Sequence, residues 1–360
     1  MSGAEPAIGA LATDRRVVVC AGPGGVGKTT ISAAIALQAA RAGRRACVIT
    51  VDPARRLADA LGVRALSNTP TPVEGELAGS LHALMLDTRG TFDDLVGRYS
   101  RSEAQAESIR ANRIYQNLTG MLSGTQEYMA MEKLYELTED GRFDVVVVDT
   151  PPTRNALDLL DAPRRLTRFL DNRLFRALLA PTRASLKVLT LATQALLRTI
   201  SKVAGAEIVQ DAVDFFQAFE GMEEGFSRRA AAVRDLLADP ATAYVLITSP
   251  RPDAIEEATY FAGRLAETGL HPAVLVVNRV HPTFGPVEAP DGTEGPLRAL
   301  LENHDRLRAT AAYENRAVSS LAAGIDAPAV ARLPLLGDDV HDLAGLGVVA
   351  DHLFGPASVG

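Results

Sequence analysis

The sequence is poor in the residues that build disulfide frameworks and soft-metal sites. It has 360 residues, of which two are cysteines, Cys20 and Cys47, and none is tryptophan. Two thiols supply neither a disulfide framework nor a four-cysteine zinc site, and both lie in apolar runs typical of strands, so we expect buried thiols. The six histidines show no metal-ligand spacing. We therefore expect no zinc.

Long apolar runs and an excess of positive charge are also lacking. No run approaches the roughly 18 apolar residues of a membrane-spanning helix, and the first 14 residues lack the basic region of a signal peptide. The 37 Lys and Arg against 44 Asp and Glu give a net charge of −7, which counts against nucleic acid as a partner. We expect a cytoplasmic protein with no transmembrane segment, and peripheral contact with a membrane stays open.

What the sequence does contain is a series of continuous apolar runs, which are typical of parallel strands covered on both faces. The runs Val17–Ala21 and Arg45–Asp52 flank a helical stretch that ends near Gly43, which is the order of a right-handed βαβ unit. Similar runs follow at Asp144–Asp149, Ala243–Ser249 and Pro272–Asn278, with shorter ones at Leu81–Asp87 and Ala331–Leu336. The pattern predicts an α/β fold with a doubly wound, mostly parallel sheet.

Two long stretches without strand signal, about 91–141 and 154–240, carry apolar residues at helical spacing. We predict that they form a helical subdomain inserted into a single domain at 14–356, with 1–13 as a flexible N-terminus. Val188–Leu197 is apolar on nearly every face, and an aromatic cluster follows it at Phe215, Phe216, Phe219, Met222 and Phe226. These residues either line a groove for a hydrophobic client or form subdomain core or a dimer interface.

The segment from Gly22 to Thr29 matches the phosphate-binding motif G-x4-G-K-[ST] and lies between a predicted strand and a predicted helix. In this motif backbone N–H groups surround the phosphates, Lys28 reaches the β and γ phosphates, and the Thr29 hydroxyl is a Mg²⁺ ligand. The predicted nucleotide-binding residues are Gly22, Gly24, Gly25, Val26, Gly27, Lys28, Thr29 and Thr30.

Two acidic residues end apolar strands: Asp149 joins Thr29 as a predicted Mg²⁺ residue, and Asp52 joins Lys28 as a predicted catalytic residue. Asp149 ends the run Val145–Asp149, and we interpret it as the Walker B carboxylate that acts on Mg²⁺ through water. Asp52 ends the second strand at the same sheet edge, where it would orient the attacking water. The alternatives are a strand-end or capping acid at 149 and a turn-forming Asp before Pro53 at 52.

Three segments together resemble the ArsA-type family of arsenical-pump and tail-anchored-protein-targeting ATPases, within the deviant-Walker P-loop class: Ala21–Thr30, Val51–Gly62 and Val145–Pro163. Further likeness at Gly124–Leu134, Thr248–Pro252, Leu275–Val280 and Leu333–Leu346 extends the resemblance over nearly the whole chain. The resemblance implies a Mg²⁺-dependent ATPase that binds two ATP molecules between two ArsA-like protomers, as a homodimer or a heterodimer. It also implies that nucleotide state opens or closes a groove for a hydrophobic or membrane-protein client.

The same resemblance assigns roles to single residues. Asp52 would belong to switch I together with Pro53, Arg55 and Arg56. Asp149 would begin switch II, which continues through Thr150, Pro151, Thr153 and Arg154. Asn278 would contact adenine, and the segment around Pro334 would close over the base.

The chain departs from the family pattern at two places. The family usually has a second, signature lysine in the loop that reaches across the dimer, and Pro23 stands in that position. Either Arg55, Arg56 or Arg154 replaces this cation, or the chain is a weakly hydrolysing regulatory subunit of a heterodimer. In switch II, Pro151 and Arg154 replace the usual alanine and glycine, which reduces backbone freedom. An arsenite pump subunit is disfavoured because soft ions need clustered thiolates.

Overall fold

A computed structural model of the chain describes residues 4–52, 56–113, 115–116, 125–151, 211, 215, 218, 221–288, 290, 294–325, 327 and 329–355. The chain divides into two compact units. The first contains Met1–Leu86, Glu136–Leu157 and Ala238–Gly360, and the second contains Asp87–Tyr135 and Asp158–Leu237. The insertion limits expected from the sequence stay a prediction, since most of 154–240 lies outside the described residues.

Within the described residues, the first unit is built on one eight-stranded sheet in the order β3-β4-β2-β5-β1-β6-β7-β8. Neighbouring strands are parallel except for β3 and β4. The strands are β1 (Val17–Ala21), β2 (Arg45–Thr50), β3 (Thr71–Val73), β4 (Ser80–Met85), β5 (Val145–Asp149), β6 (Thr242–Thr248), β7 (Val274–Val280) and β8 (Val330–Pro334). The predicted α/β fold with a doubly wound, mostly parallel sheet is confirmed.

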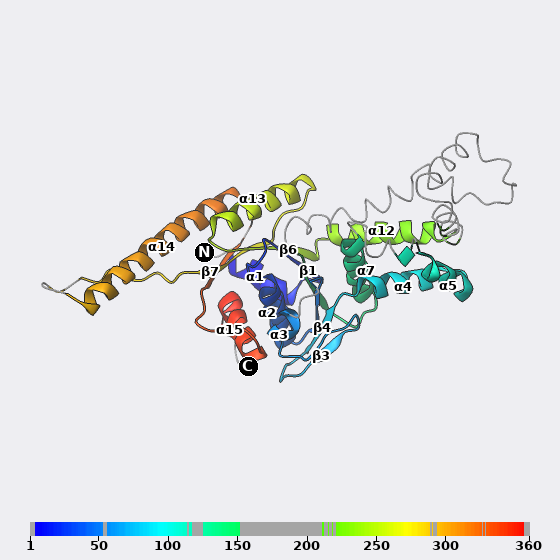
Figure 1. Cartoon of the computed structure of the whole chain (residues 1–360), viewed down its shortest axis with the longest axis horizontal. Helices are drawn as coiled ribbons and strands as arrows, with labels where there is room; N and C mark the ends of the chain where they lie inside the picture. Colours follow the sequence, from blue (N-terminus) through cyan, green and yellow to red (C-terminus); the bar gives the residue numbers. More distant parts are fainter. Residues whose placement is uncertain are drawn as a thin grey trace. The chain divides into compact units, whose positions relative to one another are not determined.

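Helices cover this sheet because alternate strand residues need partners on each face. The helices that the structure describes are α1 (Ala4–Thr13), α2 (Lys28–Arg41), α3 (Arg56–Ala60), α4 (Thr88–Tyr99), α5 (Glu103–Ala111), α7 (Thr125–Glu139), α12 (Glu223–Ala238), α13 (Pro252–Glu267), α14 (Pro296–Gly324) and α15 (Leu343–Phe354). One core joins Val18, Val48 and Val147 of the sheet to α1, α2, α3 and α15. Helices α13 and α14 contact β6 and β7 (Figure 1).

The three central strands are uniformly buried, which explains why their sequences show no alternation. Every residue of β1 and β5 is buried, and in β2 only Arg45 is exposed. Cys20 and Cys47 are both buried in these strands, as expected. Strand β3 was not predicted because it has three residues, Thr71-Pro72-Val73, and pairs antiparallel at the edge of the sheet, where a proline is tolerated.

The expected flexible N-terminus was wrong for the part of 1–13 that the structure describes. Residues Ala4–Thr13 form helix α1. Ile8, Leu11 and Ala12 are buried and belong to the core that also contains α2 and α15. The helix was missed because its three apolar contacts depend on helices that follow later in the chain.

In the second unit, the described members of the aromatic cluster are buried. Phe215, Met222 and Phe226 expose 4%, 1% and 1% of their surface. The Phe226 ring lies 5.2 Å from that of Tyr99 and 6.3 Å from that of Phe92, measured between centroids. These three residues are therefore core, whereas Phe216, Phe219 and Val188–Leu197 lie outside the described residues. No helix in the described part of the chain is long and apolar enough to cross a membrane.

Candidate nucleotide-binding site

The loop between β1 and α2 has a backbone that only glycine allows at several positions. Gly25 and Gly27 have φ angles of 75° and 92°, in the left-handed region. A Cβ at Gly22 would lie 1.9 Å from the carbonyl oxygen of Ile247, and one at Gly27 would lie 2.4 Å from Nδ2 of Asn278. The glycines therefore set both the shape of the loop and its close contact with β6 and β7.

Lys28 begins α2 and is held inside this loop. Its side chain is 8% exposed, and Nζ donates a hydrogen bond of 2.9 Å to the Pro23 carbonyl oxygen. Burial lowers the pKa of Lys28, while the nearby charges of Asp149 and Asp52 oppose that shift. The ammonium group is thus desolvated beside the N-terminus of a helix, where an anion would be its natural partner.

From the described part of the chain, Asp149 accepts two hydrogen bonds on one carboxylate oxygen and none on the other. Oδ2 accepts from Thr29 Oγ1 at 2.7 Å and from Thr50 Oγ1 at 2.9 Å. Oδ1 is buried and has no hydrogen-bond partner among the residues that the structure describes. Burial raises the pKa of Asp149, and the bonds from Thr29 and Thr50 and the charge of Lys28 act in the opposite direction. An unpaired, buried carboxylate oxygen needs a donor or a cation.

This arrangement fits Mg²⁺ held mainly by the nucleotide and water. Within the described residues no group of three or more His, Cys, Asp or Glu could hold a metal ion. Mg²⁺ typically takes one or two protein oxygens and completes its shell with phosphate oxygens and water. The hydroxyl of Thr29, with the open Oδ1 of Asp149 beside it, matches that requirement.

Asp52 lies near Asp149 because both residues are hydrogen-bonded to Thr50, at the end of β2. Its backbone N–H donates to Thr50 Oγ1 at 3.3 Å, and its Oδ2 lies 3.7 Å from Nη1 of Arg56. The structure therefore brings together Lys28, Thr29, Asp52 and Asp149, which the sequence predicted. Thr50 links Asp52 to Asp149 through its hydroxyl group. Thr50 was missed in the sequence, although a hydroxyl residue two positions before a strand-end aspartate could have indicated it.

The residues expected in the switch segments are only partly described. Thr150 follows β5, and its backbone N–H and Oγ1 donate to the Cys20 carbonyl oxygen at 3.2 and 2.8 Å. Pro151 is half-buried, and Arg56 is exposed. Pro53, Arg55, Thr153 and Arg154 lie outside the described residues.

Two consecutive residues of β7 contact the glycine loop. Nδ2 of Asn278 donates to the Val26 carbonyl oxygen at 2.8 Å, and Nη1 of Arg279 donates to the Gly25 carbonyl oxygen at 3.0 Å. Pro334 lies at the end of β8 and pairs with Val280, close to Asn278 in the sheet. The sequence singled out Asn278 and Pro334 but missed Arg279, because a basic residue at a strand end carries no distinctive signal.

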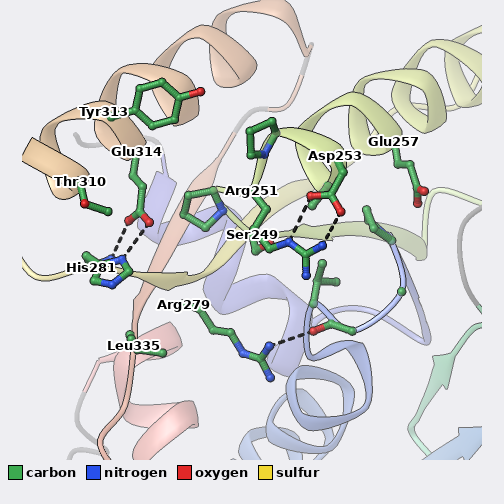
Figure 2. A pocket seen from close by; sticks show the side chains of 17 residues that line it. Ser249, Arg251, Asp253, Glu257, Arg279, His281, Thr310, Tyr313, Glu314 and Leu335 are labelled. Carbon is green, nitrogen blue, oxygen red and sulfur yellow. Dashed lines mark hydrogen bonds and ion pairs between the residues drawn. The ribbon is translucent and has the colours of Figure 1, made fainter. Parts of the chain in front are cut away.

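A cavity of about 540 Å³ adjoins the loop, and Figure 2 shows the side chains that line it. It is bounded by the loop, by the start of α13, by the ends of β7 and β8 and by the middle of α14. His281 donates its backbone N–H to one Glu314 oxygen at 2.9 Å and faces the other with Nδ1 at 2.8 Å. Arg251 pairs with Asp253 at the rim. No sequence motif predicted this cavity, because its walls come from distant segments.

The fold and the glycine loop define a P-loop nucleoside triphosphatase: a parallel sheet, a loop matching G-x4-G-K-[ST] at the first strand-to-helix junction, and a strand-end aspartate bonded to the loop threonine. The anion-transporting ATPase family matches residues 15–354. The chain belongs to this family, and the predicted ArsA-type resemblance is confirmed.

Individual relatives are similar to this chain over different lengths. An uncharacterized protein of Streptomyces coelicolor is 33% identical over 307 residues, covering 85% of this chain and 72% of that protein. The ATPase ASNA1 homolog of Cryptosporidium parvum is 26% identical over 288 residues, which cover 80% of this chain and 70% of that homolog. The ATPase asna-1 of Caenorhabditis elegans is 32% identical, but the match spans only 45% of that protein.

Proposed function

We propose that this chain is a Mg²⁺-dependent ATPase that cycles as a nucleotide-switched dimer in the cytoplasm and couples ATP binding and hydrolysis to binding or delivery of a hydrophobic or membrane-protein client. The enzymatic part of this proposal rests on the hydrogen bonding of the Asp149 carboxylate. One carboxylate oxygen accepts hydrogen bonds from Thr29 and Thr50, and the other is buried and has no partner within the described ranges. A purely structural strand-end acid would have no reason to keep that oxygen unpaired.

Different groups of the loop contact different parts of the triphosphate. Backbone N–H groups of the loop and the start of α2 bind the phosphate oxygens, and Lys28 adds a desolvated positive charge. Mg²⁺, when bound with ATP, neutralises charge on the β and γ phosphates, with Thr29 and Asp149 as the residues that would hold it. Asp52 orients the attacking water and accepts its proton. Hydrolysis then changes the contacts of switch I and switch II.

Asn278 and Pro334 would contact the base. They lie on the adjacent strands β7 and β8, Asn278 is hydrogen-bonded to the loop, and Leu335, which follows Pro334, lines the adjoining cavity. A cavity with a mixed apolar and polar lining suits a nucleoside. Competition between ATP and other nucleoside triphosphates, with and without Asn278→Ala, would measure this selectivity.

The dimer and the client rest on the family, whose named members include the ATPase asna-1 and the ATPase get3 of Aspergillus terreus. The ATPase subunit of an arsenite pump stays disfavoured for this chain. Cys20 and Cys47 are both buried, and burial raises the pKa of the Cys20 thiol to about 12. A soft metalloid would require an exposed cluster of thiolates.

The first prediction separates nucleotide binding from hydrolysis. Lys28→Ala removes the fixed cation, so calorimetric binding of ATP with Mg²⁺ should be lost. Asp52→Asn keeps the phosphate contacts but removes the proton acceptor, so ATP should still bind while turnover falls about 10²- to 10⁴-fold.

Asp59→Asn is the matched control, because Asp59 is an exposed acid on the adjacent helix α3 and should leave turnover unchanged. Normal turnover of Asp52→Asn would refute the catalytic assignment. Failure of the wild-type chain to bind ATP would refute the proposed function.

Pro23 supports one alternative, in which the chain is a weakly hydrolysing regulatory subunit of a heterodimer. Pro23 occupies the loop position of the signature lysine, and its carbonyl oxygen accepts the hydrogen bond of Lys28. A lysine from a different subunit would then complete the site. Steady-state ATPase assays of the chain alone and mixed with a lysine-bearing paralogue distinguish the two, since the alternative requires weak or no activity alone and much higher activity in the mixture.

A further inference from the structure

Strand β7 contains a bulge at the place where it meets the phosphate-binding loop. Its register with β8 shifts between Val277, which pairs with Arg332, and Val280, which pairs with Pro334. Three steps along β7 therefore correspond to two along β8. Within the described residues, Arg279 is the only non-glycine residue with a positive φ, at 61°. A long side chain in this conformation is uncommon and marks a local constraint.

The bulge changes where side chains can reach. In a regular strand, consecutive side chains point to opposite faces of the sheet. Here Asn278 and Arg279 contact consecutive peptide groups of the same loop, at the carbonyl oxygens of Val26 and Gly25. Figure 2 shows the Arg279 guanidinium extending to the loop along the edge of the cavity. The extra residue in β7 lets these neighbouring side chains reach the same loop.

These contacts determine the direction of the amides that face a phosphate. A peptide group is planar and trans, so its N–H points away from its C=O. The carbonyl of Gly25 shares a peptide group with the N–H of Val26, and the carbonyl of Val26 shares one with the N–H of Gly27. Holding both oxygens toward β7 therefore turns both N–H groups to the opposite side of the loop.

We infer that Arg279 is a positioning residue for phosphate binding: with Asn278, it forms a bulge clamp that orients the Val26 and Gly27 amides before the nucleotide arrives. This inference rests on the proposed function for its ligand. Arg279 does not touch the phosphates in this role; it acts through the Gly25 carbonyl oxygen. Without the clamp the binding groups remain present. The loop must then become ordered when the nucleotide binds, and this ordering costs free energy.

The test uses a substitution that distinguishes the effect of the Arg279 guanidinium from the effect of the backbone conformation at this position. Arg279→Gly removes the side chain while glycine adopts a positive φ without strain, so the bulge is retained. Arg279→Lys keeps the charge but replaces the planar fork with a single ammonium group. Arg332→Ala is the matched charge control, because Arg332 is an exposed arginine on β8 next to the bulge and has no hydrogen bond to the loop in the described residues.

Two readouts are measured on the full chain. In titration calorimetry with ADP and Mg²⁺, Arg279→Gly should raise Kd about tenfold, Arg279→Lys should raise it less, and Arg332→Ala should match the wild type. In hydrogen exchange without nucleotide, Arg279→Gly should speed exchange of the peptide covering residues 22–30, with other β7 peptides and the melting temperature unchanged.

Wild-type affinity and wild-type exchange in Arg279→Gly would overturn the clamp. An equal loss of affinity in Arg332→Ala would also overturn it, because the effect would then be general electrostatics. A wild-type chain that bound no nucleotide would refute the proposed function, while the exchange measurement would still decide whether Arg279 orders the loop.

Discussion

At the scale of single residues, the site depends on a carboxylate whose burial is unfavourable in free energy. Asp149 lies between two β-strands at the sheet centre and is 1% exposed. Two threonine hydroxyls donate hydrogen bonds to one oxygen, and no described residue donates one to the other. Such an unsatisfied buried atom lowers stability by about 1–3 kcal/mol. The proposed role of Asp149 beside Mg²⁺-bound water would give this oxygen a partner.

The raised pKa of Asp149 leads to a prediction about stability and pH. A folded-state pKa above the reference of 3.8 means that the folded chain binds the proton more tightly than the unfolded chain. The resulting loss of stability is fully present above the folded pKa and disappears as pH falls toward 3.8. Asp149→Asn removes the charge at nearly constant shape, so it should raise the free energy of unfolding at pH 8, and this gain should shrink as pH falls.

The measurement is urea unfolding of both chains without nucleotide at a series of pH values. Asp144→Asn serves as a control of opposite sign, because hydrogen bonds from Arg45 lower the pKa of Asp144 to about 2. The Asp144 carboxylate stabilises the fold above its unfolded pKa and loses that contribution as pH falls toward about 2. A gain for Asp149→Asn that is independent of pH would contradict the argument.

At the residue scale, sequence patterns predicted the members of the site that the motif contains. Lys28 and Thr29 have fixed spacing from Gly22, and Asp52 and Asp149 each end an apolar run. Thr50 and Arg279 could not be found in this way. Their roles depend on which strands are neighbours and on the bulge in β7, and both features arise from pairing between segments that are distant in the chain.

At the scale of elements, the strands with long apolar runs were predictable and the short or marginal elements were not. Strands β1, β2 and β5 lie at the sheet centre, so both of their faces are apolar and the signal is strong. Strand β3 and helix α1 carry too little local pattern, because each is stabilised by tertiary contacts. A propensity argument alone therefore assigns them to loop or flexible chain.

Helix α1 gives the prediction at this scale. Leu11 is 0% exposed and belongs to the core shared with α2 and α15. Leu11→Ala should therefore lower the free energy of unfolding by about 2–5 kcal/mol, since it removes buried methyl groups and leaves a cavity. The measurement is equilibrium unfolding in urea.

Gly9→Ala is the control on the same helix, because a Cβ there meets nothing within 4 Å. This substitution should leave stability unchanged or raise it by up to about 1 kcal/mol. If Leu11→Ala proved neutral, the N-terminal segment would not be part of the folded core in solution.

At the scale of the whole molecule, the described site lies within the first of the two units. The cavity beside the loop is bounded entirely by the first unit, and its rim carries charged side chains of Arg251, Asp253 and Glu257. A second protomer placed over the loop, as the family resemblance implies, would enclose the phosphates and exclude water. Exclusion of water strengthens the electrostatic contacts that stabilise the transferring phosphoryl group.

Nucleotide-dependent dimerisation is the prediction that belongs to this scale. Asp52→Asn should bind ATP without consuming it, so ATP with Mg²⁺ should shift the mass of this variant from 38.2 kDa toward twice that value. Lys28→Ala should remain at the mass of one chain under the same conditions, because the phosphates no longer hold the interface. Sedimentation velocity with and without ATP measures both. If Asp52→Asn bound ATP and stayed at one chain, the homodimer would be excluded and a different subunit would be required to complete the site.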